Sequence, residues 1–366
     1  MKDFNEVPWW KPESAGTELD KITDVINRDY LNEGDVTHLF EEKIATFCGT
    51  KYCIAVTSGT SAIYLSLMAL GIGPGDEVIV PDMTFVATAN AVTMTGAKVV
   101  LVDVDRETLT MCPKSLQDAI SNSSKAIIPV HVSGRSGTLL EILSIAKNYN
   151  IPVIEDAAEA LGSKIDGSSL GSFGITGCFS LSPFKTISSG QGGLIVTDDK
   201  KLSIRLAELK DQGRPFRGTG GDDDHPALGF NFKYTNLQAA VGLAQLEEIN
   251  FRLGKQRYIQ EFYREKLGSL SDFTLLPFDI SNGEVPLWTD AIASDRNELV
   301  AYLEGKKIYT RRFWHPIHTN SYYLSDTKRF PISSELAYKA MWLPSAYQLT
   351  DEQLNYVSNE IIKFYG

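Results

Sequence analysis

The chain has 366 residues, of which 43% are hydrophobic and 22% are charged, and its formal net charge is −11. This length is sufficient for two domains, and the composition is typical of a globular enzyme. The acidic balance argues against a broad basic surface for nucleic acid or anionic lipid. An anionic substrate would therefore need a local cluster of donors.

The N-terminal stretch lacks the basic and apolar regions of a secretory signal, and no apolar run approaches membrane-spanning length. The four cysteines have no CxxC spacing, so we expect buried thiols rather than disulfides or zinc ligands. These features predict a cytoplasmic protein with no bound metal and no membrane or nucleic-acid partner.

Between residues 51 and 213, short apolar runs alternate with segments whose apolar spacing is close to 3.6 residues. This alternation predicts a largely parallel sheet with helices on both faces. The expected strands are 51–56, 77–81, 98–104, 125–132 and 152–157, followed by a strand pair at 177–182 and 192–198.

The pattern changes after about residue 245, where QLEEINFRLGKQRYIQEFYREKLGSL predicts one long amphipathic helix. We therefore expect a large domain with an N-terminal arm over 1–245 and a smaller C-terminal α+β domain over 246–366. The glycine-rich, charged loop at 214–229 is of the length that is often functional or mobile.

Two motifs lie where predicted strands end. In VTSGTSA (56–62), a helix begins after the strand, so free N–H groups favour an anion and Gly59 allows close approach of a phosphate. By itself this motif also fits a simple Ser58 helix cap. In VIEDAAEA (153–160), Asp156 lies at the strand edge where ligands bind in open parallel sheets. A buried carboxylate there needs a partner such as a protonated pyridine nitrogen, or else it caps a helix.

A third motif surrounds Lys185, which follows a predicted strand and precedes SSGQGG. A lysine in a crowded polar pocket can form a Schiff base, whereas the alternative is a solvated lysine on a turn. A phosphate cradle, a carboxylate and a lysine are the three groups that a pyridoxal 5′-phosphate site needs. Their combination favours this cofactor over three unrelated structural residues.

Several long stretches resemble, in order, the DegT/DnrJ/EryC1/StrS family of sugar aminotransferases over nearly the whole chain. These stretches are SGTSA, GIGPGDEVIVP, TFVATANAV, KAIIPVHVSG, VIEDAAEALG, FSLSPFKTISSGQGGLIVT and GFNFKYTNLQAAVGLAQLE. Within the family, the chain is most similar to members that act on 4-keto-6-deoxy sugar nucleotides. The resemblance implies an aspartate-aminotransferase-like α/β fold (fold type I) and a homodimer with shared active sites.

The resemblance also implies the cofactor-binding residues. Lys185 is the Schiff-base lysine, and Asp156 pairs with the pyridine nitrogen. The other implied contacts are Gly59, Thr60 and Ser180 at the phosphate, Phe85 stacked on the ring, Glu159 beside the cofactor, and Asn231 donated by the neighbouring subunit. Without the family, Phe85 would be interpreted as helix core and Asn231 as a turn residue. His131 is expected to be structural.

The chain departs from the family at two places. Gln191 replaces the usual glutamate of GEGG, and Ser182-Pro183-Phe184 replaces an aromatic residue, glycine and asparagine before the lysine. These changes leave the cofactor chemistry intact and bear on the substrate. Lysine rather than histidine at position 185 argues against the dehydratase branch of the family.

The resulting prediction is transfer of an amino group from L-glutamate to a nucleotide-linked keto-sugar, for surface polysaccharide such as O-antigen. Candidate substrate contacts are Arg311, Arg312, His315 and His318, which would bind nucleotide phosphates or glutamate carboxylates, unless TRRFWHPIH is a solvated turn. Trp9 and Trp10 are candidates for covering the base or for packing.

Two alternative functions remain open. Family relatives also act on 3-keto sugar nucleotides or keto-inositols. A non-catalytic, cofactor-binding regulator would use the same fold, but this class usually carries an appended nucleic-acid-binding module, for which the chain has no basic helix.

Overall fold

The computed structural model describes residues 6–215 and 224–366, so the middle of the predicted loop at 214–229 lies outside the described residues. Its main sheet has one part in the order β1-β9-β8-β5 and another in the order β3-β2-β4. Parallel bridges from Ile127 to Val153 and from Val130 to Asp156 join the two parts. The strands are β1 (Tyr52–Val56), β2 (Glu77–Pro81), β3 (Lys98–Val102), β4 (Ser124–Ile127), β5 (Ile154–Asp156), β8 (Thr176–Ser180) and β9 (Gly193–Thr197).

Within the described chain, β9 is antiparallel to both of its neighbours, and the other pairings of this sheet are parallel. The prediction of a mostly parallel sheet is therefore confirmed. The strand expected at 125–132 is shorter than predicted, because Pro129 has no N–H to donate to a neighbouring strand. The chain after Pro129 is irregular, and His131 N donates to Asp156 O over 3.0 Å.

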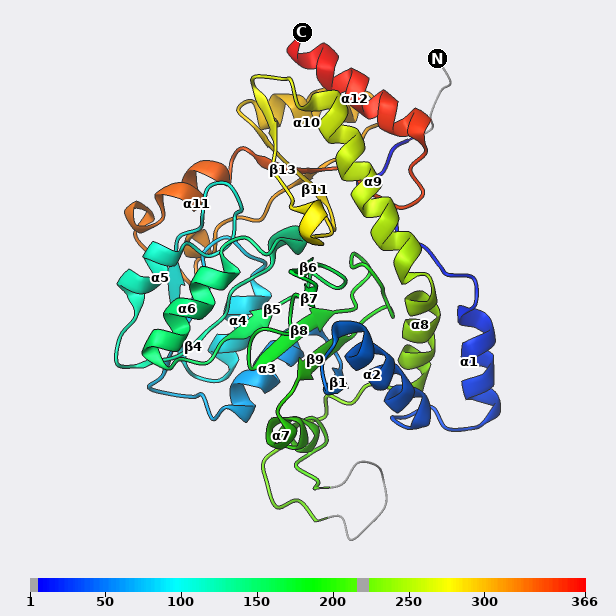
Figure 1. Cartoon of the computed structure of the whole chain (residues 1–366), viewed down its shortest axis with the longest axis vertical. Helices are drawn as coiled ribbons and strands as arrows, with labels where there is room; N and C mark the ends of the chain where they lie inside the picture. Colours follow the sequence, from blue (N-terminus) through cyan, green and yellow to red (C-terminus); the bar gives the residue numbers. More distant parts are fainter. Residues whose placement is uncertain (1–5, 216–223) are drawn as a thin grey trace.

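Helices cover both faces of the main sheet (Figure 1). Successive residues of β1 show why: Ile54 and Val56 pack into the cluster that contains α3, α4 and α7, whereas Cys53 and Ala55 pack into the cluster that contains α2 and α8. Helices α5 and α6 cover the β2–β4 region. The bounds are α1 (Glu18–Asn27), α2 (Asp35–Cys48), α3 (Gly59–Ala69), α4 (Ala87–Met94), α5 (Pro113–Ala119), α6 (Leu139–Tyr149), α7 (Lys200–Lys210) and α8 (Asn236–Glu247).

A second, antiparallel sheet has the order β10-β11-β13-β12 and its own apolar cluster with α9, α10 and α12. Figure 1 shows α9 running from the main sheet toward this second layer. The bounds are α9 (Ile249–Leu267), β10 (Phe273–Leu275), β11 (Thr289–Ala293), α10 (Arg296–Gly305), β12 (Arg311–Arg312), α11 (Pro331–Leu336), β13 (Ala340–Leu343) and α12 (Asp351–Tyr365), with the small pair β6 (Lys164–Ile165) and β7 (Ser168–Ser169) beside the main sheet.

Two details differ from the expected organisation. The single long helix predicted after residue 245 is split between α8 and α9, because Glu248 has a non-helical backbone with φ −93° and ψ 8°. The N-terminal arm crosses to the second sheet, where Val7 pairs with Ile308 and is fully buried. The division at residues 245 and 246 remains a prediction.

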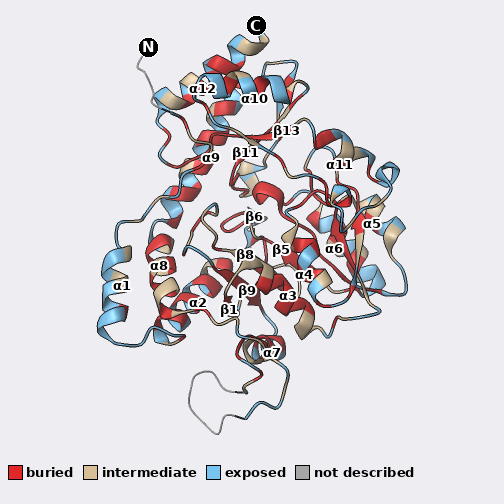
Figure 2. Ribbon diagram, turned by 180° about the vertical axis from the view of Figure 1, so that it is seen from behind, coloured by how far each residue is buried: buried red, intermediate tan, exposed pale blue. Residues whose placement is uncertain are grey.

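Burial follows these layers (Figure 2). Buried residues concentrate in the strands and in α3 and α8, whereas α1 is largely exposed and buries only Val25. In the described part of the chain, no helix combines the length and apolar character that crossing a bilayer requires.

The close approach of β9 to α3 yields a test of the fold. A Cβ added to Gly193 would collide with the backbone of Ser58 and Gly59, which cannot yield as a flexible side chain can. Gly193→Ala should therefore lower the free energy of unfolding by about 1–3 kcal/mol, measured by urea denaturation.

Gly254 provides the matched control, because it is exposed within α9 and nothing lies within 4 Å of an added Cβ. Gly254→Ala should stabilise the protein by about 0.5–1 kcal/mol, since alanine is the better helix former. Equal effects of the two substitutions would contradict the close packing at Gly193.

Candidate active site

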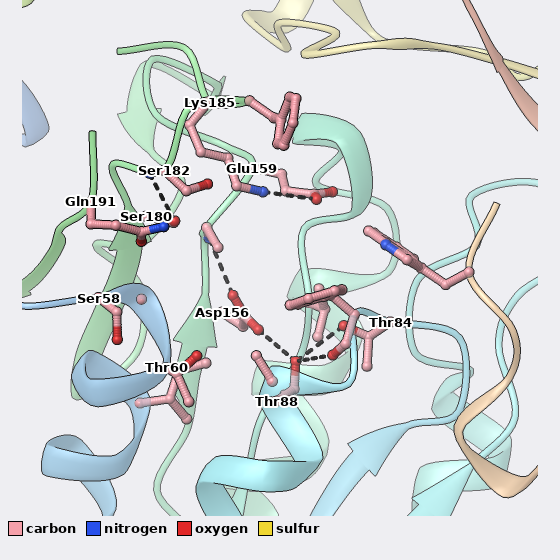
Figure 3. Close-up of a pocket in the computed structure, with 18 of the residues that line it drawn as sticks. Ser58, Thr60, Thr84, Thr88, Asp156, Glu159, Ser180, Ser182, Lys185 and Gln191 are labelled. Carbon is pink, nitrogen blue, oxygen red and sulfur yellow. Dashed lines mark hydrogen bonds and ion pairs between the residues drawn. The ribbon is translucent and has the colours of Figure 1, made fainter. Parts of the chain in front are cut away.

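A cavity of about 310 Å³ lies where β5 and β8 end and α3 begins (Figure 3). The carboxyl ends of parallel strands and the amino end of a helix thus meet at one place, which is the usual location of ligands in such sheets. The predicted residues that line this cavity are Gly59, Thr60, Phe85, Asp156, Glu159, Ser180, Lys185 and Arg311.

The start of α3 forms one wall of the cavity. Ser58 caps this helix: its side chain accepts from Ser61 N over 3.1 Å, and Ser61 Oγ accepts from Ser58 N. The helix-cap interpretation is therefore confirmed, and because the capping residue also lines the cavity, the anion site remains a prediction for the same turn. Gly59 lies so close to β8 that an added Cβ would be 3.0 Å from Ser180 Cβ. The first N–H groups of the helix have no partner within it and can bind an anion.

Asp156 is the last residue of β5 and is 5% exposed. Thr88 Oγ1 donates to Asp156 Oδ2 over 2.7 Å, and Ala158 N donates to Oδ1 over 3.2 Å. Burial raises the pKa of Asp156, although the hydrogen bond from Thr88 acts in the opposite direction. A carboxylate desolvated in this way is well placed to pair with a cation inside the cavity.

Lys185 lies on the connection between β8 and β9, and its side chain points toward Glu159 (Figure 3). The Nζ atom donates to Glu159 Oε1 over 3.0 Å and lies 5.1 Å from the centre of the Trp288 ring. Burial raises the pKa of Glu159, and the charge of Lys185 opposes this rise. The family resemblance implied that Glu159 lies beside the cofactor, and the structure adds that it is the hydrogen-bond partner of the lysine.

Arg311 alone among the candidate substrate contacts reaches the cavity in the described chain. Its guanidinium carbon lies 4.9 Å from the ring centre of Trp9 and 5.5 Å from that of Trp342. Arg312, the next residue of β12, is exposed, because successive side chains of a strand point to opposite faces. His315 is also exposed and outside the cavity.

His318 is held elsewhere by a buried carboxylate. Its Nδ1 atom lies 2.7 Å from Asp82 Oδ2, its backbone N donates to Asp82 Oδ1 over 2.8 Å, and its ring stacks on Phe330 at 4.7 Å. The residue is 1% exposed. The structure therefore gives His318 a packing role, and we leave it out of the proposed site together with Arg312 and His315.

The other candidates have distinct environments. Asn231 is exposed, pairs with Asp211 and does not line the cavity, so its assignment to a neighbouring subunit remains a prediction. Trp10 is buried and donates to Pro183 O over 3.2 Å, which favours the packing interpretation. His131 is buried between Glu155 and the carbonyl of Arg135, as expected for a structural histidine.

Sequence reasoning missed several residues of this site. Thr84 lies just before α4, its Oγ1 is 3.1 Å from that of Thr88 within the helix, and Thr88 Oγ1 donates a hydrogen bond to Asp156. Trp288 and Trp314 also line the cavity but come from the aromatic-rich second half of the chain, where no local pattern marked them.

The comparisons with known proteins agree with this geometry. A model of the DegT/DnrJ/EryC1/StrS aminotransferase family matches residues 12–362. A GDP-perosamine synthase from Escherichia coli O157:H7 is 36% identical over 365 residues, covering 98% of this chain and 99% of the relative. A GDP-perosamine synthase from Caulobacter vibrioides is 34% identical, with 98% of each chain covered.

Solved structures show the same architecture. DesV from S. venezuelae, in complex with a ketimine intermediate, superimposes with a TM-score of 0.93 at 27% identity, covering 98% of both chains. A DegT DnrJ EryC1 StrS aminotransferase from Brucella abortus gives a TM-score of 0.90 at 28% identity, covering 95% of both chains. From its sequence, its fold and the match over nearly its whole length, the chain belongs to the DegT/DnrJ/EryC1/StrS aminotransferase family.

Proposed function

We propose that this protein is a pyridoxal 5′-phosphate-dependent aminotransferase that transfers an amino group from L-glutamate to a nucleotide-linked keto-sugar. One observation carries the proposal: Lys185 Nζ enters a cavity that also holds a buried carboxylate, Asp156, and the amino end of a helix. Membership of an aminotransferase family supports the reaction type.

The residues of the cavity fit this cofactor. The first turn of α3, with Gly59, Thr60 and the neighbouring Ser180, would hold a phosphate. The desolvated carboxylate of Asp156 would hold a protonated ring nitrogen. When bound, pyridoxal phosphate supplies an aldehyde that reacts with amines and a ring that withdraws electrons. Phe85, which is 52% exposed, would lie against the ring.

The chain's own side chains perform the remaining tasks. Lys185 Nζ is the group that can take up and deliver protons at the reacting carbon atoms. Glu159 accepts a hydrogen bond from Nζ and so fixes the direction in which the amine points. Arg311 offers a guanidinium to an anionic group of a substrate, either a nucleotide phosphate or a glutamate carboxylate. Trp288 and Trp314 add apolar rings to the lining of the cavity.

The choice of sugar is supported by the relatives. Both GDP-perosamine synthases match almost the full chain, so we propose a 4-keto-6-deoxy sugar nucleotide as acceptor and surface polysaccharide such as O-antigen as the destination. A homodimer in which Asn231 completes the partner's phosphate site belongs to the same proposal. A panel of 4-keto and 3-keto sugar nucleotides and keto-inositols, assayed with glutamate, would separate the alternatives.

Replacing Lys185 tests the reaction. Lys185→Ala should lower turnover by about 10³-fold or more, because no other amine lines the cavity in the described chain. The variant should also lose the long-wavelength absorbance of lysine-linked pyridoxal phosphate. Lys185→Arg, which keeps the positive charge but cannot form the linkage, should be equally inactive. Full activity of either variant would end the proposal.

Replacing Asp156 tests the contact with the ring nitrogen. Asp156→Asn should weaken cofactor affinity by about 10- to 100-fold, the range for a hydrogen bond to a charged group. Because burial raises the pKa of Asp156, the carboxylate is ionised above that pKa and neutral below it. The affinity difference between wild type and variant should therefore be full at high pH and shrink as the pH falls through the raised pKa. Fluorescence titration with the cofactor from pH 5 to 9 measures this dependence, and a difference that grows toward acid would contradict the assignment.

Two neighbouring arginines test the anion contact. Arg311→Ala should raise KM by about 10- to 100-fold, because it removes a guanidinium from the cavity. Arg312→Ala is the matched control and should change KM by less than about twofold, since this side chain is exposed. Whether the KM of glutamate or of the sugar nucleotide rises identifies the bound anion. Equal effects of the two substitutions would exclude Arg311 as a specific contact.

A further inference from the structure

We propose that Ser133 is a positioning residue that connects the second sheet to Lys185 through Glu159. The connected groups are Asp290, Ser133, Glu159 and Lys185, and we call their hydrogen bonds the Ser133 link. This inference rests on the proposed function, because it concerns how the same lysine is held ready for the cofactor.

Ser133 has an unusual backbone conformation. It lies in a short 3-10 segment, Val132–Gly134, with φ 52° and ψ 18°, which is the left-handed region that serine rarely adopts. The residue is fully buried. A strained and buried conformation persists only where surrounding contacts enforce it, and such residues cluster at functional sites.

Every polar group of Ser133 takes part in these contacts. The backbone N donates a hydrogen bond to Glu159 Oε2 over 2.9 Å. The other oxygen of the same carboxylate accepts a hydrogen bond from Lys185 Nζ. The side-chain Oγ donates to Asp290 Oδ1 over 2.9 Å. The carbonyl oxygen accepts from Leu287 N over 2.8 Å. Ser133 therefore binds the second sheet with its hydroxyl and the active-site carboxylate with its amide.

Asp290 is itself held firmly. It lies on β11, is 1% exposed, and its Oδ2 forms a buried ion pair with Arg135. The Arg135 guanidinium also lies over the ring of Phe278 at 3.8 Å, and its Nε donates to Pro277 O. On the neighbouring strand, Trp342 Nε1 donates to Ser133 Oγ over 3.3 Å. The serine hydroxyl is thus fixed from both β11 and β13.

The consequence for Lys185 is geometric. Glu159 lies in a buried site where its direction depends on the few donors that reach it, and Ser133 N is the donor opposite Lys185. Displacement of Ser133 would rotate Glu159 and move the amine that must reach the cofactor. Small displacements of a reacting group are costly, because reaction requires close and aligned atoms.

Ser136 offers a matched control three residues along the same segment. It is buried, and its N and Oγ donate to the buried Glu284 over 2.7 and 2.6 Å. Ser136→Ala thus removes one buried hydroxyl–carboxylate bond, as Ser133→Ala does. Among the described residues, however, no hydrogen bond joins Ser136 to Glu159.

The experiment uses the full chain freed of cofactor. The rate at which each variant acquires the absorbance of lysine-linked pyridoxal phosphate is measured by stopped flow, and unfolding temperatures are recorded in parallel. Ser133→Ala should slow this rate by about tenfold. Ser136→Ala should lower the unfolding temperature by a similar amount but keep the rate within about twofold of wild type. Trp342→Phe, which removes the indole donor to Ser133 together with part of a buried ring, should slow it by about threefold.

Steady-state kinetics with glutamate and a GDP-linked 4-keto-6-deoxy sugar provide the second measurement. Ser133→Ala should lower kcat while KM changes by less than about twofold, because the amine is misplaced but the substrate contacts remain. The inference is overturned if Ser133→Ala and Ser136→Ala behave alike, or if Ser133→Ala alters only stability or KM. If wild-type protein never acquires the absorbance, or Lys185→Ala retains it, the proposed function itself has failed.

Discussion

The burial of two carboxylates, Asp156 and Glu159, in one cavity is the constraint on which the rest of this site depends. A charge taken out of water is costly unless donors or opposite charges surround it. Asp156 accepts a hydrogen bond from Thr88 of α4. Glu159 accepts one from Lys185, on the connection between β8 and β9, and one from Ser133, in the segment after β4. The cavity is therefore organised by the donors that these two groups require.

The sheet topology explains why those donors meet. Parallel strands bring the ends of β5 and β8 to one edge, and α3 begins at the same place. Because β9 runs antiparallel to β8, the connection between them turns back at this edge of the sheet. Lys185 lies on that connection and is therefore held over Asp156 (Figure 3). The one antiparallel strand of the described main sheet thus places the lysine.

The second sheet closes the cavity with aromatic rings and one cation. Trp288 and Trp342 lie 4.7 Å apart between ring centres, and Trp9 of the N-terminal arm packs against both. Arg311 lies against this layer and faces the cavity. Rings of this size exclude water and strengthen electrostatic interactions inside the cavity. The distant parts of the chain therefore form a single site.

Local periodicity and strand ends were sufficient to predict the alternating strands and helices, the mostly parallel sheet, and the three motifs at Gly59, Asp156 and Lys185. The family resemblance added Phe85 and Glu159, which also reach the cavity. The hydrogen-bond and packing partners of these residues depend on the three-dimensional arrangement of the chain. Thr88, Ser133 and Trp288 come from separate segments, and the choice of Arg311 over Arg312 depends on which face of β12 meets the cavity. Such contacts arise from packing between elements far apart in the chain, which no local pattern encodes.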